Sequence, residues 1–241
     1  MRTPLTNVKK MNYKDFLENI NITMEDFCRE SFFENRDHIR VKKEATVVKN
    51  LQRIFDAVFK ISYEKGFQAM SMRDLSREAE MSMGALYAYF SSKEELLEII
   101  QRQGRAIVNR AITVCLDGDE PPDLKLHNLI RTHLYLSEIG RPWFYFTFME
   151  AKNLSKKERD EVLAMESFTE NILVDILEEG SRQGIFVKKN HRLTACMIKA
   201  MQQEWYLKRW KYSKRKISVD QYADCVLEFV DAFLKPDKSG P

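Results

Sequence analysis

The chain has 241 residues, of which 44% are hydrophobic and 31% are charged, and its formal net charge is +3. The hydrophobic fraction is enough to bury the core of one large or two smaller domains, which excludes disorder throughout the chain. The small net charge excludes nucleic-acid binding through bulk charge, so any such binding must depend on local basic patches. The 4 Cys have no short spacing, the start has no secretory signal, and no apolar run approaches the ~20 residues that span a bilayer. We therefore expect a reduced, cytoplasmic protein with no membrane partner.

Residues 1–40 are expected to contain two helices, and the second begins at Thr23 with Asp26 as its partner in a capping box. The small apolar faces of these helices must be buried somewhere. We favour packing on the larger domain or on a partner subunit, and the alternative is an arm that contacts DNA or gates a ligand. A cluster of cations follows: Arg40, Lys42, Lys43, Lys49 and Arg53. These side chains could meet DNA phosphates or form an ordinary solvated charge run.

The stretch from Ser71 to Leu97 predicts a helix-turn-helix. Ser71 and Asp74 form a capping box that begins one helix, and Ser82 can cap a second helix with the sequence MGALYAYF. Two helices this short need a supporting helix, which the apolar residues between positions 51 and 61 supply just upstream. The result is a three-helix unit.

The run KGFQAMSMRDLSREAEMSMGALYAYFSSKEELL, residues 65–97, resembles the DNA-binding segment of the TetR family of bacterial transcriptional regulators. The resemblance implies a homodimer that binds a double-stranded operator. Two departures from the usual pattern matter. Glu80 stands where the turn usually carries Gly, so we expect the turn to be made without a residue that is free to take a positive φ. Met83 stands where Lys, Arg or Pro is frequent, which removes a familiar contact donor.

Eight residues are the candidate DNA contacts: Ser71, Arg73, Ser82, Met83, Gly84, Tyr87, Tyr89 and Lys93. Gly84 would let the helix approach the DNA backbone, while the two tyrosine hydroxyls and Lys93 would meet phosphate oxygens. For base discrimination, Arg73 could take a guanine edge and Met83 a thymine methyl group, with DNA shape supplying the rest. The alternative for the two tyrosines is packing against neighbouring helices.

Helices fill the remainder of the chain. A long amphipathic helix is expected from about Lys93 to Leu116, a loop over residues 117–122, and a further helix that Gly140 stops. The next helix begins at Pro142 and is aromatic all round, so it must be buried on nearly all sides or line a cavity.

The last third of the chain predicts three more helices. Ser155 is expected to cap the first of them, and Gly180 and Gly184 to end it. A final pair, roughly residues 193–212 and 218–234, is joined by the basic link SKRK. The resemblance implies that this pair forms a four-helix bundle with the same pair of a second subunit, although its apolar stripe also suits an internal core.

The C-terminal sequence EWYLKRWKYSKRKISVDQYADCVLEFVDAFL resembles that of TetR regulators that sense fatty acyl-CoA or related thioesters. The resemblance implies an effector site, for which the aromatic side chains would suit an apolar tail and the basic ones an anionic head group. The candidates are Arg102, Arg105, His127, Arg131, Trp143, Phe144, Phe146, Phe148, Trp205 and Tyr206. The alternative is that the aromatic residues are simply core.

No enzyme motif accompanies these helices. The sequence has no HExxH, CxxC, GxSxG or glycine-rich phosphate loop, and its four His are not spaced as a helical metal pair. We therefore expect no catalytic residues, no metal and no cofactor. The predicted fold is all-α: a helical extension (1–40), a three-helix helix-turn-helix DNA-binding domain (41–100), a larger helical ligand-binding and dimerisation domain (101–235), and a tail (236–241).

The predicted function is a ligand-responsive regulator, a repressor released from an inverted-repeat operator by a small apolar or acyl-CoA-like effector. A ligand that displaces the helix carrying Arg102 and Arg105 would change the separation of the two recognition helices in the dimer. Two alternatives remain open: a DNA-binding dimer without a small-molecule effector, and a soluble protein that binds acyl thioesters or lipids.

Overall fold

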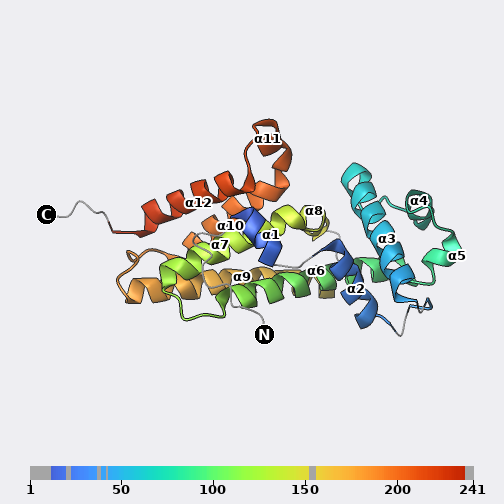
Figure 1. Ribbon diagram of the computed structural model, residues 1–241, viewed down its shortest axis with the longest axis horizontal. Helices are drawn as coiled ribbons and strands as arrows, with labels where there is room; N and C mark the ends of the chain where they lie inside the picture. The colour runs from blue at the N-terminus through green and yellow to red at the C-terminus, as the bar shows by residue number, and fades with distance from the viewer. Residues whose placement is uncertain (1–11, 20–22, 37–38, 42, 152–155, 237–241) are drawn as a thin grey trace. The chain divides into compact units, whose positions relative to one another are not determined.

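The structure is a computed structural model that describes residues 12–19, 23–36, 39–41, 43–151 and 156–236. All regular secondary structure in these ranges is helical, which confirms the all-α prediction (Figure 1). None of the described helices combines the length and the apolar character that crossing a bilayer requires.

The helices follow one another along the whole described chain. In order, they are α1 (Tyr13–Asn19), α2 (Met24–Glu34), α3 (Glu44–Lys65), α4 (Met72–Glu78), α5 (Met83–Leu86), α6 (Lys93–Leu116), α7 (Pro122–Ile139), α8 (Arg141–Glu150), α9 (Lys156–Arg182), α10 (His191–Leu207), α11 (Arg209–Lys214) and α12 (Val219–Leu234).

These helices divide into two compact units. The helix-turn-helix (HTH) unit comprises Asn21–Ile107 and Pro142–Asp160, and so contains α2 to α5, the first part of α6 and most of α8. The C-terminal unit comprises Met1–Ile20, Val108–Arg141 and Glu161–Pro241, with α1, α7, α10, α11 and α12. Both α6 and α9 contribute residues to each unit.

The core of the HTH unit forms around α3, whose apolar stripe is buried as predicted. Phe27 of α2 packs edge-on against Phe55 of α3, with ring centroids 5.4 Å apart. Phe146 of α8 makes the same kind of contact with Phe59 and with Phe67, each at 5.6 Å. Helices from three distant parts of the sequence therefore share one core.

The aromatic helix α8 also packs closely on α6 within this unit. The indole of Trp143 lies directly over Gly104, where a Cβ would come within 1.9 Å of the ring. Its N–H donates a hydrogen bond of 3.0 Å to the carbonyl of Ile100. Glycine at position 104 is what allows this approach, because any side chain there would overlap the ring.

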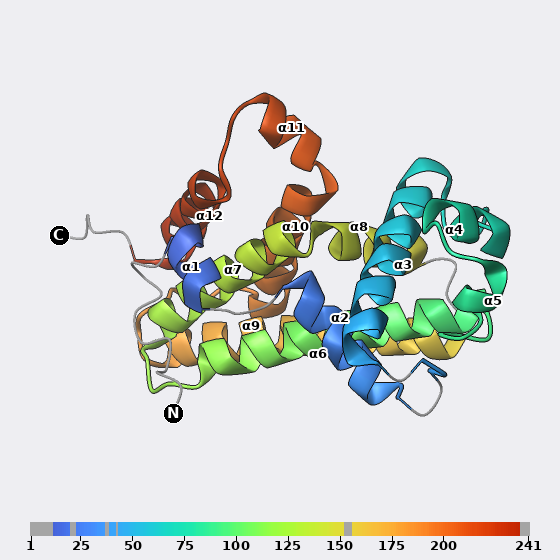
Figure 2. The same cartoon turned by 45° about the vertical axis from the view of Figure 1, so that its right-hand side comes forward.

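In the C-terminal unit, α7, α10 and α12 pack against one another, and α1 lies against them (Figures 1 and 2). Phe16 of α1 contacts the ring of Tyr135 on α7 at 5.1 Å, and the N–H of Tyr13 donates to the carboxylate of Asp220 on α12 at 2.9 Å. The favoured interpretation of the N-terminal extension is thus confirmed for α1, which packs on the larger helical unit. The second helix, α2, belongs to the HTH unit instead.

Some predicted helix ends were wrong for tertiary reasons. Gly180 lies inside α9 and does not end it, because its missing Cβ makes room for the ring of Phe186, 2.1 Å from where that Cβ would be. Gly184, with φ 71°, follows the end of the helix as predicted. The helix predicted over residues 193–212 breaks at Lys208 into α10 and α11. The predicted cap at Ser155 lies outside the described residues.

Candidate DNA-binding surface and effector site

Side-chain caps define the two short helices of the helix-turn-helix. The hydroxyl of Ser71 accepts a hydrogen bond of 3.1 Å from the N–H of Asp74, whose carboxylate accepts one of 3.0 Å from the N–H of Ser71. The ammonium of Lys65 lies 2.8 Å from the same carboxylate, and together with Ser71 it holds the pKa of Asp74 well below its usual range. Ser82 caps α5, because its hydroxyl accepts from the N–H of Ala85 at 3.1 Å. The predicted capping residues are confirmed.

The turn between α4 and α5 corrects one expectation. Glu80 adopts φ 49°, so the left-handed conformation that glycine usually supplies is present here in a glutamate. This conformation costs a non-glycine residue about 1 kcal/mol. Arg53 of α3 holds the turn, since its guanidinium donates to the carbonyl of Glu80 at 3.1 Å and to its carboxylate at 3.0 Å.

Most of the candidate DNA contacts lie at the surface of the α4–α5 pair. Arg73, Ser71, Ser82 and Gly84 are exposed, and Tyr87 keeps 43% of its surface accessible. A Cβ added to Gly84 would meet nothing within 4 Å, so the backbone there is open to close approach. Met83 is half-buried beside them.

Two of the eight candidates lie elsewhere in the HTH unit. Tyr89 is only 2% exposed, and its hydroxyl accepts a hydrogen bond of 2.7 Å from the amide of Asn50, which matches the packing alternative. The ammonium of Lys93 donates to three main-chain carbonyls between α3 and α4, those of Phe67, Gln68 and Met70, at 3.0–3.2 Å. Lys93 thereby closes the end of the supporting helix.

The predicted effector residues do not come together in one unit. Arg102, Arg105, Trp143, Phe144, Phe146 and Phe148 belong to the HTH unit, and the other four belong to the C-terminal unit. Trp143, Phe144 and Phe146 are buried in the core that α8 shares with α3 and α6, whereas Phe148 is exposed. Arg102 donates to the amide oxygen of Asn35 at 2.7 Å.

The four residues in the C-terminal unit already have partners within it. His127 contacts the carboxylate of Asp231 at 2.8 Å, and Arg131 donates to the hydroxyl of Tyr135 and to Asp224. The indole N–H of Trp205 donates to Glu138 at 3.0 Å. Tyr206 is buried, and burial raises the pKa of its phenol.

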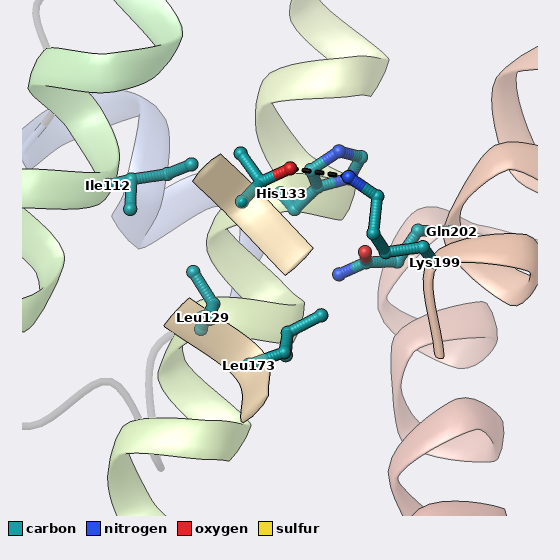
Figure 3. A pocket seen from close by; sticks show the side chains of 7 residues that line it. Ile112, Leu129, His133, Leu173, Lys199 and Gln202 are labelled. Carbon is teal, nitrogen blue, oxygen red and sulfur yellow. Dashed lines mark hydrogen bonds between the residues drawn. The ribbon is translucent and has the colours of Figure 1, made fainter. Parts of the chain in front are cut away.

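A small cavity in the C-terminal unit brings together polar residues that the sequence did not single out. Its volume is about 10 Å³, roughly room for one water molecule. Aliphatic side chains form one part of the wall and polar side chains the other, as Figure 3 shows. The lining residues are Ile112, Leu129, His133, Thr169, Leu173, Lys199 and Gln202.

Lys199 dominates the electrostatics of this cavity. It is only 6% exposed, and its ammonium donates to the carbonyl of Glu166 at 3.1 Å, to the carboxylate of the same residue at 3.0 Å, and to the hydroxyl of Thr169. Burial, together with this positive charge, lowers the pKa of His133 to about 3. The cavity therefore presents a buried cation, a neutral imidazole and the side-chain amide of Gln202 beside an aliphatic wall. Such a surface can bind a hydrogen-bond acceptor with an apolar tail.

One sequence signal could have identified this cluster. The buried stripe of α10 runs through Ala195, Ile198, Trp205 and Tyr206, and Lys199 and Gln202 lie on it. A lysine in a stripe that is otherwise apolar is rarely buried without a specific reason.

Comparison with known protein families gives a match for two regions of the chain. Residues 54–100 match the family described as bacterial regulatory proteins, tetR family, and residues 119–230 match a tetracyclin repressor-like C-terminal domain. The HTH-type transcriptional regulator HbdR of Aromatoleum sp. (strain CIB) is 21% identical over 182 residues, which are 76% of this chain and 80% of that protein.

Solved structures share the fold. The ketosteroid regulator KstR2 of Mycobacterium tuberculosis superposes with a TM-score of 0.70 at 20% identity, covering 76% of this chain and 94% of that one. AibR in complex with isovaleryl coenzyme A and operator DNA superposes with a TM-score of 0.66 at 20% identity, covering 78% and 99%. The matched families and the relatives named above are regulators of transcription and not enzymes. With two tetR family models matching about two thirds of its length, this chain belongs to the TetR family of helix-turn-helix transcriptional regulators.

Proposed function

We propose that this protein is a ligand-responsive repressor that binds an inverted-repeat operator as a homodimer and releases it when an acyl-CoA-like effector enters the C-terminal unit. The observation that carries the proposal is the cluster of Lys199, His133 and Gln202 beside an aliphatic wall in the core of that unit. The likeness to AibR, whose structure holds isovaleryl coenzyme A and operator DNA, supports the choice of effector class.

The DNA-binding part of the proposal rests on the exposed face of α4 and α5. A two-fold dimer presents two such faces, so its site must be an inverted repeat with half-sites set by their separation. Large apolar side chains on α10 and α12 supply a surface for the second copy: Leu193, Met197, Phe229 and Phe233 are all exposed. Burying them in a dimer would remove this apolar area from water.

The effector part follows from the chemistry of the cavity. A thioester carbonyl is an acceptor that Gln202 can bond, and that Lys199 can bond in exchange for its hydrogen bond to the Thr169 hydroxyl. An acyl chain suits the wall formed by Ile112, Leu129 and Leu173. A cavity of about 10 Å³ must widen to admit such a ligand, so binding has to displace a lining helix. The effector then favours the widened state, and a ligand with equal affinity for both states would shift nothing.

The helix best suited to carry this displacement is α6. It holds Ile112 in the cavity wall and, near its other end, Leu96 and Leu97 in the core of the HTH unit. A shift of a continuous helix moves both ends, so a small displacement at Ile112 would change the separation of the two recognition helices in the dimer. Half-sites about 34–36 Å apart tolerate little such change.

The test uses the operator that the protein selects from random DNA. Fluorescence anisotropy should show that long-chain acyl-CoA lowers operator affinity and that free CoA does not. Lys199→Met should retain operator affinity and lose the response, whereas Lys188→Met, on the exposed surface of the same unit, should respond normally. An effector at 100 times its Kd should also add about 2.7 kcal/mol of stability in a thermal-shift assay. If a panel of acyl thioesters neither stabilises the protein nor weakens the DNA complex, the chain is a DNA-binding dimer without this effector.

A further inference from the structure

A short basic segment of the C-terminal unit connects its last two long helices, α10 and α12. We call residues 208–217, which contain α11, the α11 arm; Figures 1 and 2 show it where the chain leaves α10 and returns to α12. Its sequence from 208 to 216, KRWKYSKRK, has six cations and no acidic residue. The function proposed above makes no use of this segment.

The base of the arm is firmly attached to the unit. Arg209 donates to both carboxylate oxygens of Glu138 at 3.0–3.1 Å, and its guanidinium stacks over the ring of Trp205 at 4.6 Å. Tyr212 is buried, with its ring 5.3 Å from Trp205 and 4.9 Å from Tyr222. The arm is therefore a fixed platform, and its outward side chains are held in place before anything binds.

The outward side of the arm combines one aromatic ring with unpaired charge. Trp210 is 66% exposed and shares a helix face with Lys214, four residues further on. Lys214, Arg215 and Lys216 are exposed, and none of the three has an ion pair with another described residue. By contrast, Lys208 and Lys211 are both paired with Glu204. Of the six cations of the arm, Lys214, Arg215 and Lys216 therefore remain available for an external anion, since Arg209 is paired with Glu138.

The turn that ends the arm has a lysine at a position where the backbone conformation favours glycine. Lys216 adopts φ 57°, and the N–H of Ile217 donates to the carbonyl of Tyr212 at 3.0 Å, as in a Schellman motif. A lysine in this left-handed position is less favourable than glycine. The strained backbone of Lys216 thus places a third positive charge next to Lys214 and Arg215 in the sequence.

We propose that the α11 arm binds the phosphorylated adenosine end of a coenzyme A thioester. Trp210 stacks on the adenine, and Lys214, Arg215 and Lys216 pair with the phosphate groups. An aromatic face flanked by cations fits a base that carries several phosphates close to it. The inference deepens the proposed function, on which its acyl end rests, by naming a second contact for the same ligand.

The distance from the cavity to the α11 arm matches the length of the pantetheine part of coenzyme A. Gln202 lines the cavity, and the chain from Gln202 to the end of α10 at Leu207 rises about 7.5 Å. Three further residues lead to Trp210, so the two points lie within about 18 Å along the chain. The pantetheine arm of coenzyme A has the length of roughly five extended residues, about 17 Å, and can join them.

The test separates the two ends of the ligand. Calorimetric titration of the full chain uses adenosine 3′,5′-bisphosphate for the nucleotide end, a long-chain acyl N-acetylcysteamine thioester for the acyl end, and the matching acyl-CoA. In the variant Lys214→Gln/Arg215→Gln/Lys216→Gln, the bisphosphate and the acyl-CoA should bind more weakly, on the order of tenfold, because three exposed charge pairs are lost. The N-acetylcysteamine thioester should bind with unchanged affinity. Trp210→Ala should lower the affinity for the bisphosphate by a similar factor.

A matched variant controls for charge. Arg182→Gln/Lys188→Gln/Lys189→Gln removes the same number of exposed cations from the same unit and should leave all three affinities unchanged. The proposal is overturned if the bisphosphate does not bind the native protein, or if both triple variants weaken it equally. It is also overturned if the arm variant instead lowers operator affinity and its salt dependence, since the arm would then contact DNA. If the protein binds the bisphosphate but does not bind the acyl thioester, the nucleotide site on the α11 arm is supported and the acyl-CoA effector is refuted.

Discussion

Replacing Gly104 by alanine should show how closely α6 and α8 pack in the HTH unit. The added Cβ would lie 1.9 Å from Cε2 and 2.1 Å from Nε1 of Trp143. Ordinary carbon contacts need about 3.5 Å, so the buried indole must move by about 1.5 Å. This movement also breaks the 3.0 Å hydrogen bond from the indole N–H to the carbonyl of Ile100.

The magnitude follows from these two effects. Overpacking a core costs about 1–3 kcal/mol, and a buried donor without an acceptor costs about 1–3 kcal/mol more. The better helix propensity of alanine offsets about 1 kcal/mol of this. We therefore expect Gly104→Ala to lower the free energy of unfolding of the HTH unit by about 3 kcal/mol.

Urea unfolding followed by circular dichroism and by tryptophan fluorescence measures this change. Gly84→Ala is the control, because nothing lies within 4 Å of its added Cβ, and it should alter stability by less than about 1 kcal/mol. The double variant Gly104→Ala/Trp143→Leu should be little less stable than Trp143→Leu alone, because the smaller side chain leaves room for the methyl group. An unfolding curve for Gly104→Ala that coincides with that of the native protein would refute the tight contact between the indole and α6.

The pKa of His133, lowered from 6.5 to about 3, predicts that acidification through this range destabilises the protein, because the unfolded state takes up a proton that the folded state does not. Native protein should lose up to about 1.4 kcal/mol per pH unit more than His133→Gln in denaturant titrations at several pH values, and equal slopes would contradict the assignment. Lys93→Ala should lower the melting temperature, because three carbonyls lose their donor; a normal melting curve with weaker DNA binding would indicate a phosphate contact instead. Arg73→Ala and Met83→Ala should change the preference among operator variants in a selection assay while the melting temperature stays the same. Phe229→Asp, at a position 68% exposed in the single chain, should shift sedimentation towards monomer, and an unchanged sedimentation coefficient would place the dimer contact elsewhere.

The sequence predicted helices well where local chemistry sets their limits. The long helix from Lys93 to Leu116 has the predicted bounds, and Gly140 ends α7 as expected. The capping residues Ser71 and Ser82 begin α4 and α5 because each side chain bonds a main-chain N–H three residues on. Such contacts involve neighbours in sequence, so a single sequence contains all the information needed.

Features that depend on distant partners could not be predicted in this way. Glu80 takes its left-handed conformation beside Arg53, which is 27 residues away in sequence. Gly180 was predicted to end a helix, but its role is to leave space for the ring of Phe186, which only the packed structure shows. At the candidate site, composition suggested an aromatic pocket, but it could not show that Phe146 joins the core around α3. The apolar stripe of α10 marks Lys199 as an unusual residue, but its partners Glu166 and Thr169 lie on α9, and only packing brings them to its ammonium.

The way the chain alternates between its two units limits what can be transplanted. It passes from one unit to the other four times, and residues 142–160 return to the HTH unit after α7 is complete. A chimeric regulator that borrowed only residues 41–100 would leave behind Phe27, Phe32 and Phe146, all buried in the native core. Each lost aromatic side chain would forfeit about 2 kcal/mol or more of burial and uncover apolar surface on the graft. An exchangeable DNA-reading module therefore has to include α2 and α8, and the recipient must accept α8 as an insertion between its own helices.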